Sequence, residues 1–219
     1  MSNMKLAPSL LAADFLNLQR DIATIEQAGC DYLHFDVMDG RFVNNISFGL
    51  PLLEAIRPST NLILDCHLMI AQPSRYIKAF ADAGADIITF HVEVDEDIVD
   101  NIDRIRYLDK KVGLAINPHT ETDMIMPYLD MIDMVTVMTV QPGFGGQSFR
   151  PELLANIEMF SEYLYRNRLN ADIQVDGGIN LTNVDQVLDA GANVIVAGSA
   201  IFGAPDVTTA VKDFKDRFY

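Results

Sequence analysis

The sequence predicts a single-domain α/β protein, a closed barrel of eight parallel strands and their helices, the (β/α)8 or TIM barrel. Three observations indicate this fold. Eight short apolar segments recur along the 219 residues, helical periodicity separates most of them, and one turn motif is repeated. The mean spacing between the starts of successive apolar segments is about 25–30 residues, the size of one βα unit in such a barrel. No Pro-, Gly- or Ser-rich segment divides the chain, so we expect residues 1–219 to form one domain.

The apolar segments have the length of buried strands. In chain order they cover residues 6–10, 32–35, 62–64, 87–90, 112–116, 134–137, 173–175 and 194–197. The helical pattern between them is clear after the first segment, where apolar residues recur at Leu16, Leu18, Ile22 and Ile25. Strands that alternate with helices along the chain predict parallel pairing.

A repeated turn precedes three of the predicted strands. It reads Gln-Ala-Gly-Cys-Asp at 27–31, Asp-Ala-Gly-Ala-Asp at 82–86 and Asp-Ala-Gly-Ala-Asn at 189–193. Glycine at this place ends a helix, and the following apolar segment then enters the sheet. Three copies of one turn indicate equivalent units around one sheet. An open doubly wound sheet could carry the same turn, but eight units without a break in composition favour closure.

Charge and composition exclude several classes of partner. Sixteen Lys and Arg against 31 Asp and Glu give a formal net charge of −15. Such a surface repels nucleic acid and anionic lipid, so we expect neither nucleic acid nor membrane among the partners. The chain shows no signal-peptide pattern, which predicts a cytoplasmic protein. Cys30 and Cys66 could form one bridge, but two buried free thiols in a reducing compartment are the expectation.

Two histidines stand beside carboxylates near predicted strand ends. His34 and Asp36 share one face of the second strand, Asp65 and His67 share one face of the third, and Asp176 ends the seventh. In a barrel these ends meet at one mouth. Two imidazoles and two carboxylates there, from His34, Asp36, His67 and Asp176, would suit a divalent metal ion. Taken singly, each could equally be a hydrogen-bonded polar group at a strand end.

Glycines follow each of the last three predicted strands. Backbone N–H groups at glycines can approach an anion closely, and phosphate sites after strands seven and eight are frequent in this architecture. Ordinary turn formation would explain any one pair, whereas three consecutive loops favour a phosphate site. The residues are Gly143, Phe144, Gly145 and Gly146, then Gly177 and Gly178, then Gly198 and Ser199.

Two further positions are ambiguous. Ser9 ends the predicted first strand, where its hydroxyl could bind a ligand or simply complete the strand end. His91 and Glu93 share a face after the fourth strand, and for them we expect a supporting or structural role.

Six stretches match one known family in its own order. They are residues 7–14 (APSLLAAD), 34–40 (HFDVMDG), 65–69 (DCHLM), 138–147 (MTVQPGFGGQ), 175–178 (VDGG) and 197–199 (AGS). On these motifs the chain resembles the ribulose-phosphate 3-epimerase family along nearly its whole length. One departure is Asn44, which stands where the family usually has proline and leaves the shape of that loop open.

The resemblance implies an isomerase of the pentose phosphate pathway that inverts C3 of D-ribulose 5-phosphate to give D-xylulose 5-phosphate. It implies one divalent ion per subunit (Zn, Fe, Mn or Co) on His34, Asp36, His67 and Asp176. Asp36 and Asp176 would exchange protons with the substrate through an enediolate. Ser9 and His67 would contact the sugar, and the glycine loops would hold its phosphate. A homo-oligomer, dimer or hexamer, is also implied.

Three alternatives stay open at this stage. The first is a D-allulose-6-phosphate 3-epimerase of the same mechanism, and the second is a related barrel lyase such as hexulose-phosphate synthase. The third is a barrel that binds sugar phosphates without catalysis. Asp36 and Asp176 argue against the third, because inversion needs a base on each face of the substrate and binding does not.

Overall fold

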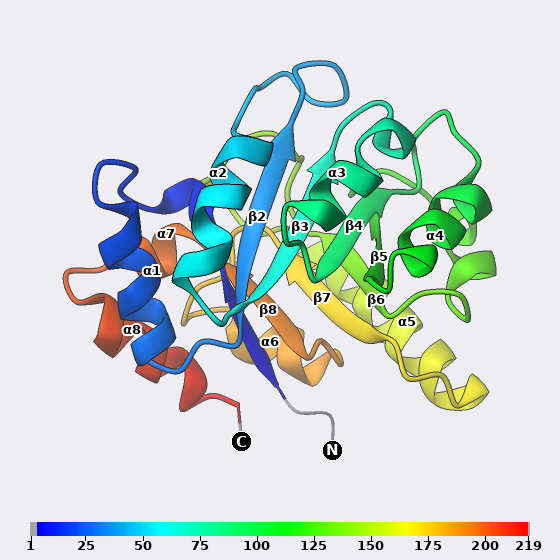
Figure 1. Ribbon diagram of the computed structural model, residues 1–219. Coiled ribbons are helices and arrows are strands. Elements are labelled where there is room, and N and C mark those ends of the chain that lie inside the picture. Colours follow the sequence, from blue (N-terminus) through cyan, green and yellow to red (C-terminus); the bar gives the residue numbers. More distant parts are fainter. Residues whose placement is uncertain (1–3, 219) are drawn as a thin grey trace.

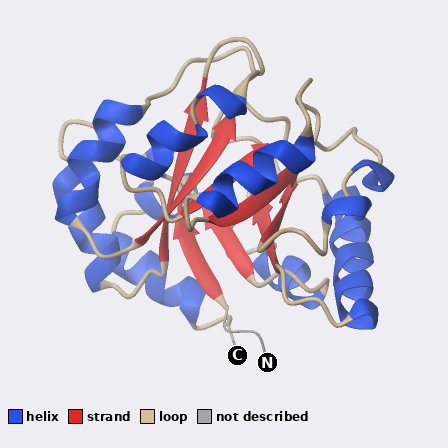
Figure 2. Ribbon diagram, turned by 45° about the vertical axis from the view of Figure 1, so that its right-hand side comes forward, coloured by secondary structure: helices blue, strands red, loops and turns tan. Residues whose placement is uncertain are grey.

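The computed structural model describes residues 4–218, and its eight parallel strands form a barrel with helices packed around it (Figures 1 and 2). The strand order is β1-β8-β7-β6-β5-β4-β3-β2, and a bridge between Ser9 and His34 brings β1 beside β2. The strands are β1 Lys5–Pro8, β2 Tyr32–Met38, β3 Ile63–Met69, β4 Ile87–His91, β5 Lys111–Ile116, β6 Met134–Met138, β7 Asp172–Asp176 and β8 Val194–Ala197. The predicted fold class is confirmed.

Helices connect most strands on the outside of the barrel. They are α1 Leu18–Gln27, α2 Leu50–Ile56, α3 Ile77–Asp82, α4 Ile98–Tyr107, α5 Leu154–Asn167, α6 Val184–Asp189, α7 Ser199–Phe202 and α8 Val207–Lys215. Between β5 and β6 the chain forms two short 3-10 helices, Thr122–Met124 and Met126–Tyr128. Among the described residues, none of these helices has the length and apolar character needed to cross a bilayer.

The repeated turns adopt the conformation predicted from their glycines. Gly29, Gly84 and Gly191 have φ of 91°, 107° and 110°. Side chains with a Cβ rarely adopt positive φ, so glycine allows the chain to leave each helix and re-enter the sheet within a few residues.

Three strands end two or more residues away from their predicted ends. The first strand ends at Pro8 rather than at residue 10, because Ser9 caps a 3-10 helix, Leu10–Ala12, and accepts a hydrogen bond from the backbone N–H of Leu11. The strands β2 and β3 continue to Met38 and Met69, past the predicted ends at 35 and 64. The apolar pattern breaks at Asp36 and Asp65, whose side chains point into the barrel, although the backbone pairing continues. His67 therefore lies inside β3 and does not end it.

The interior of the barrel is layered. Near the start of the strands it is apolar, with Tyr32, Ile87, Met134 and Val194 in one buried cluster. Two residues further toward the carboxyl ends of the strands lies a fully buried polar layer, formed by His34, Asp65, Thr89, Thr136 and Gln174. Alternate residues such as Leu33, Phe35 and Cys66 face outward into the main core between strands and helices. Cys30 and Cys66 are both buried and free, as expected.

Candidate active site

Four of the predicted site residues meet at the carboxyl ends of the strands. His34 and Asp36 come from β2, His67 from β3 and Asp176 from the end of β7. The register pairs Asp36 with His67, so their side chains point into the barrel side by side. One nitrogen or oxygen atom of each of the four residues lies within 4.8 Å of the others. The structure thus brings together a group that spans 142 positions of the chain, from 34 to 176.

The donor atoms face one another at short range. His34 Nε2 lies 3.2 Å from Asp36 Oδ1 and 3.6 Å from Asp176 Oδ2. His67 Nδ1 lies 3.1 Å and 3.6 Å from the same two oxygens. His34 Nε2 is nevertheless buried without a hydrogen-bond partner among the described residues. A buried nitrogen that faces two carboxylates in this way fits a metal ligand, and two N and two O donors suit a divalent transition metal.

Residues of the buried polar layer inside the barrel fix the orientation of His34. Its Nδ1 lies 2.8 Å from Asp65 Oδ2, and the same oxygen accepts a 2.6 Å hydrogen bond from Gln174 Nε2. Gln174 Oε1 in turn accepts from the hydroxyl of Thr136 at 2.8 Å. A carboxylate that accepts the Nδ1–H leaves the Nε2 lone pair facing the site. The sequence did not single out Gln174 or Thr136. Their alternation with Asp176 and Met138 predicts that they point inward, but not what they touch.

The four residues shift one another's pKa values. Burial would raise the pKa of Asp36, but His34 and His67 outweigh burial and hold that pKa well below its usual range. The same balance lowers the pKa of Asp176. Burial would lower the pKa values of His34 and His67, yet the neighbouring carboxylates raise both. The cluster therefore favours positive charge at its centre, as either protons or a cation.

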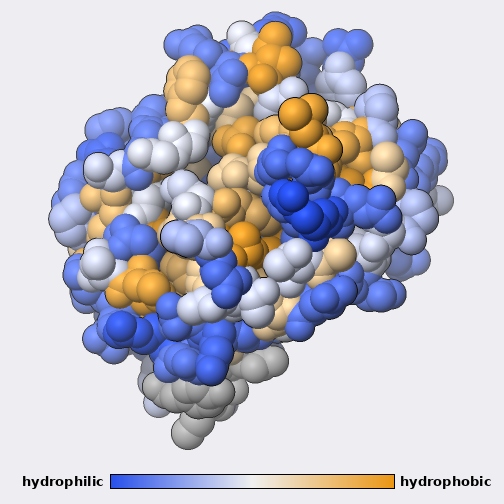
Figure 3. All heavy atoms as spheres, turned by 90° about the vertical axis from the view of Figure 1, so that its left-hand side faces the viewer, coloured by the Kyte–Doolittle hydropathy of each residue, from blue (hydrophilic) through white to orange (hydrophobic). Residues whose placement is uncertain are grey.

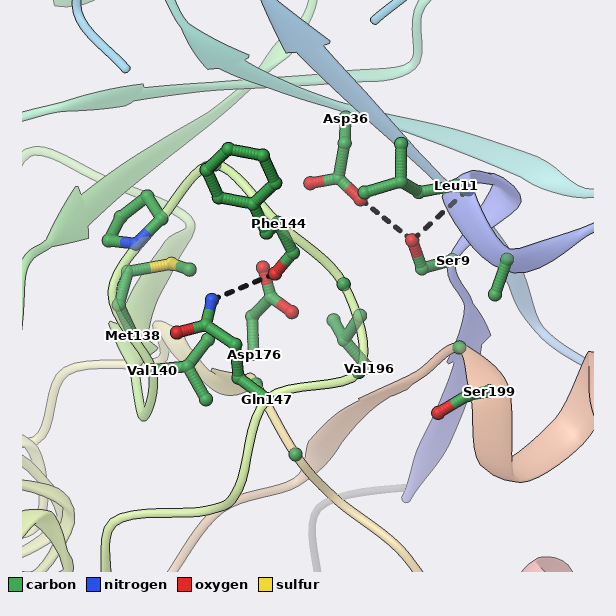
Figure 4. Close-up of a pocket in the computed structure, with 18 of the residues that line it drawn as sticks. Ser9, Leu11, Asp36, Met138, Val140, Phe144, Gln147, Asp176, Val196 and Ser199 are labelled. Carbon is green, nitrogen blue, oxygen red and sulfur yellow. Dashed lines mark hydrogen bonds between the residues drawn. The ribbon is translucent and has the colours of Figure 1, made fainter. Parts of the chain in front are cut away.

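A cavity of about 260 Å³ opens directly above the cluster. Asp36 and Asp176 both reach it, and Ser9 donates a 2.7 Å hydrogen bond to Asp36 Oδ2 (Figure 4). Met38, Met69 and Met138, the last residues of three strands, also line it. His34 and His67 are fully buried beneath. The resemblance also implies a substrate contact by His67, but this side chain is not part of the cavity lining.

The predicted glycine loops form the other side of this cavity. None of the described residues that line it is Lys or Arg, so an anion there would depend on uncharged donors, the backbone N–H groups of the glycine loops and hydroxyls such as that of Ser199. Gly178 has φ of 70°, and a Cβ there would lie 2.4 Å from the backbone nitrogen of Phe149. Glycine is therefore required where the loops pack together. The predicted loop residues in the lining are Gly143, Phe144, Gly145, Gly146, Gly177, Gly178, Gly198 and Ser199.

Two loops meet over the mouth of the barrel. Asn45 Nδ2 donates a 2.7 Å hydrogen bond to the carbonyl of Gly143, which ties the β2–α2 loop to the loop after β6. Asn44, the departure from the family pattern, is exposed beside this contact. Gln147 Nε2 donates to the carbonyl of Phe144 (Figure 4) and to the carbonyl of Gln141, and so braces the second loop from within. The Asn45 contact shapes the first loop without a proline at position 44.

Comparison with known proteins agrees with the motifs. Residues 5–202 match the family described as "Ribulose-phosphate 3 epimerase family". The chain is 47% identical over 211 residues to the ribulose-phosphate 3-epimerase of Synechocystis sp., covering 95% of this chain and 92% of the relative. It is 44% identical over 213 residues to the Bacillus subtilis protein of the same name, covering 97% and 98%.

The fold is shared more widely than the family. A crystal structure of 3-hexulose-6-phosphate synthase superposes with a TM-score of 0.71 at 20% identity, covering 98% of this chain and 99% of that one. At that identity the likeness concerns the fold alone. The family match and the relatives above 40% identity show that the chain belongs to the ribulose-phosphate 3-epimerase family and is an enzyme of the isomerase class.

Proposed function

We propose that this enzyme interconverts D-ribulose 5-phosphate and D-xylulose 5-phosphate in the pentose phosphate pathway by inverting C3. The observation that carries the proposal is the placement of Asp36 and Asp176, which reach one cavity from different strands and form one cluster with the buried His34 and His67. The curated relatives from Synechocystis sp. and Bacillus subtilis carry the name of this activity.

Inversion needs a proton to leave one face of C3 and another to arrive on the opposite face. One side chain cannot serve both faces, so two groups are required. Asp36 lies on β2 and Asp176 on β7, with β1 and β8 between them in the sheet order. Their carboxyl groups therefore approach the cavity from separate directions. In one direction of the reaction Asp36 accepts a proton while Asp176 donates one, and in the reverse direction the roles exchange.

The hydrogen bond from Ser9 holds Asp36 in place for this task. Asp36 Oδ2 accepts from Ser9, while Asp36 Oδ1 faces the imidazole nitrogens of His34 and His67. The carboxylate can thus turn little, and its oxygen near Ser9 stays at the cavity. Ser9 also lines the cavity, where its hydroxyl is within reach of a bound sugar.

The residues present fit one divalent ion per subunit, held by His34, Asp36, His67 and Asp176. When bound, such an ion supplies Lewis-acid stabilisation of the negative charge that develops as C3 loses its proton to form an enediolate. Zn, Fe, Mn and Co all accept two imidazoles and two carboxylates. The raised pKa values of both histidines mean that protons compete with the ion for these nitrogens.

The phosphate end of the substrate would lie against the glycine loops. Backbone N–H groups of successive residues in turns form concave sites for anions. This arrangement suits a protein with a net charge of −15, since the cavity needs no lysine or arginine. Phe144 is 58% exposed at the rim and can cover a bound sugar phosphate.

The first test is a proton NMR spectrum of the enzyme with D-ribulose 5-phosphate and a divalent metal in deuterium oxide. Loss of the C3 proton signal together with formation of D-xylulose 5-phosphate supports the proposal. Turnover of D-allulose 6-phosphate alone would favour the hexulose epimerase, and release of formaldehyde from hexulose phosphate would favour a lyase. Binding of the sugar phosphate without exchange would leave the non-catalytic alternative.

The proposal extends to the assembly and the location of the enzyme. Leu16 is 94% exposed and Ile46 is 75% exposed, in the loops that precede α1 and α2. Figure 3 shows hydrophobic patches among hydrophilic side chains on the face that carries α1. We expect these side chains to be covered in a homo-oligomer, a dimer or a hexamer, of a cytoplasmic enzyme with no nucleic acid or membrane partner. Light scattering coupled to size exclusion gives the mass that tests the assembly.

A further inference from the structure

A chain of hydrogen bonds leads away from His67 on the side opposite the carboxylates. His67 Nε2 lies 2.8 Å from His91 Nε2, and His91 Nδ1 lies 3.1 Å from Glu93 Oε2. Both imidazoles are fully buried, and their rings are nearly parallel with centroids 5.0 Å apart. The other oxygen of Glu93 accepts a 2.7 Å hydrogen bond from the backbone N–H of Asn117. None of this is needed to place His67 on its strand, which the sheet already does.

The hydrogen-bond acceptor at Glu93 determines which nitrogen of His91, and then which nitrogen of His67, carries hydrogen. Burial raises the pKa of Glu93, but the hydrogen bonds from His91 and Asn117 lower it by more, so Glu93 is a carboxylate that can only accept. His91 must then carry its hydrogen on Nδ1, which leaves Nε2 as an acceptor. His67 donates from Nε2 to that acceptor. A neutral imidazole with hydrogen on Nε2 has its lone pair on Nδ1, the nitrogen that faces Asp36 and Asp176.

We propose that Glu93 and His91 are positioning residues that fix the tautomer of His67, so that its Nδ1 lone pair faces the metal site. This inference rests on the metal site of the proposed function. It also explains a difference between the two histidines of the site. Asp65 takes the Nδ1 hydrogen of His34 and leaves Nε2 for the site, whereas the Glu93–His91 pair takes the Nε2 hydrogen of His67 and leaves Nδ1.

The substitution Glu93→Gln would reverse the direction of the hydrogen bonds between His67, His91 and residue 93, because Gln has nearly the same size and shape as Glu. The backbone N–H of Asn117 needs an acceptor, so the amide oxygen of Gln would stay on it and the NH2 group would face His91 Nδ1. His91 would then carry its hydrogen on Nε2 and donate to His67. The hydrogen of His67 would move to Nδ1, where it blocks the lone pair that a metal ion needs.

Zinc affinity tests this reversal. The metal-free wild-type protein and the Glu93→Gln variant are each titrated with Zn²⁺ against a chromophoric chelator, after far-UV circular dichroism has shown that both are folded. Zn²⁺ binding is expected to weaken about 10- to 100-fold in the variant. Glu96→Gln is the matched control, because it removes the same charge from the same loop while its carboxylate bonds Ser74 and Asn101 and no histidine. Its Zn²⁺ affinity is expected to stay within about twofold of wild type, since its hydrogen bonds within the described residues do not reach the site.

A second measurement needs no variant. A long-range ¹H–¹⁵N spectrum of the Zn²⁺-loaded wild-type protein, labelled on histidine nitrogen, reports which nitrogen carries each hydrogen. Hydrogen on Nε2 of His67 and on Nδ1 of His91 supports the inference. Hydrogen on Nε2 of His91, or equal Zn²⁺ affinity of wild type and Glu93→Gln, overturns it. If the wild-type protein binds no Zn²⁺, Mn²⁺, Fe²⁺ or Co²⁺, the proposed metal site fails and this inference fails with it.

Discussion

Ser9 donates a 2.7 Å hydrogen bond to Asp36 at the seam where the barrel closes, so one contact joins β1 to β2 and orients a carboxylate of the site. Ser9 lies next to His34 in the bridge between the two strands, and its hydroxyl reaches Asp36 two residues further along β2. The closure of the sheet and the aim of the proposed base therefore depend on the same residue.

Ser9→Ala is expected to lower kcat/KM for D-ribulose 5-phosphate by about 10- to 100-fold. A hydrogen bond to a charged group contributes about 1.5–3 kcal/mol, and here it orients the carboxylate proposed to move the proton. Steady-state kinetics with a coupled assay measure the change. Ser59→Ala serves as control, because the Ser59 hydroxyl donates to the carbonyl of Ile56 in the α2–β3 connection, away from the site. Unchanged kcat/KM in Ser9→Ala would contradict this role.

Asp36→Asn and Asp176→Asn are each expected to lower turnover by about 10²–10⁴-fold or more while the fold persists. Each amide removes one of the two groups proposed to exchange protons with C3. The proton NMR assay in deuterium oxide measures turnover, and circular dichroism checks the fold. If both variants keep more than a trace of activity, the two-base assignment is wrong.

The stability of the metal-free protein is expected to have a maximum in weakly acidic solution. The raised pKa values of His34 and His67 contribute stability that is complete below about pH 6.5, the ordinary value for histidine, and that is lost as the pH rises through the raised values. The lowered pKa values of Asp36 and Asp176 contribute stability above about pH 4 that is lost as the pH falls through them.

Thermal melts of the chelated protein from pH 3 to pH 10 test this dependence. A bound metal ion takes the place of the protons on the two imidazoles, so the decline on the alkaline side is expected to vanish when Zn²⁺ is present. A metal-free protein whose melting temperature does not fall between about pH 7 and pH 10 would refute the sign of the histidine contribution.

Gly178→Ala is expected to raise KM for the sugar phosphate by about tenfold or more, equivalent to about 1.4 kcal/mol of binding. An alanine at this position would have to adopt a φ of 70°, and its Cβ would lie 2.4 Å from the backbone nitrogen of Phe149. The substitution would therefore force the glycine loops apart. Inhibition by inorganic phosphate should weaken in parallel. Kinetics and phosphate inhibition constants measure both effects.

Gly29→Ala is the control for strain without contact. Gly29 has φ of 91°, no atom within 4 Å of its would-be Cβ, and a place in the turn after α1. It should cost about 1–2 kcal/mol of folding free energy and leave KM unchanged. If the KM of Gly178→Ala equalled that of Gly29→Ala, this would argue against a phosphate site formed by the glycine loops.

The local sequence pattern predicts the turns and the faces of the strand residues, because these features depend on residues close together in the chain. The glycines of the repeated turns need positive φ whatever surrounds them, and Gly29, Gly84 and Gly191 adopt it. Alternation along a strand likewise puts His34 on the same face as Asp36, as expected. Where polar side chains point into the barrel the pattern misleads, and the predicted ends of β2 and β3 come too early at 35 and 64.

The order of the strands, the faces of the site residues and the family motifs can all be read along the chain, since each depends on neighbours a few positions apart. The partners of those residues cannot. Asp65 and Gln174 are 109 positions apart, and they meet only because closure of the barrel sets the stagger of all eight strands at once. The pairing of β3 with β4 likewise places His91 against His67, 24 positions away, and in our proposal that contact decides which nitrogen of His67 carries hydrogen.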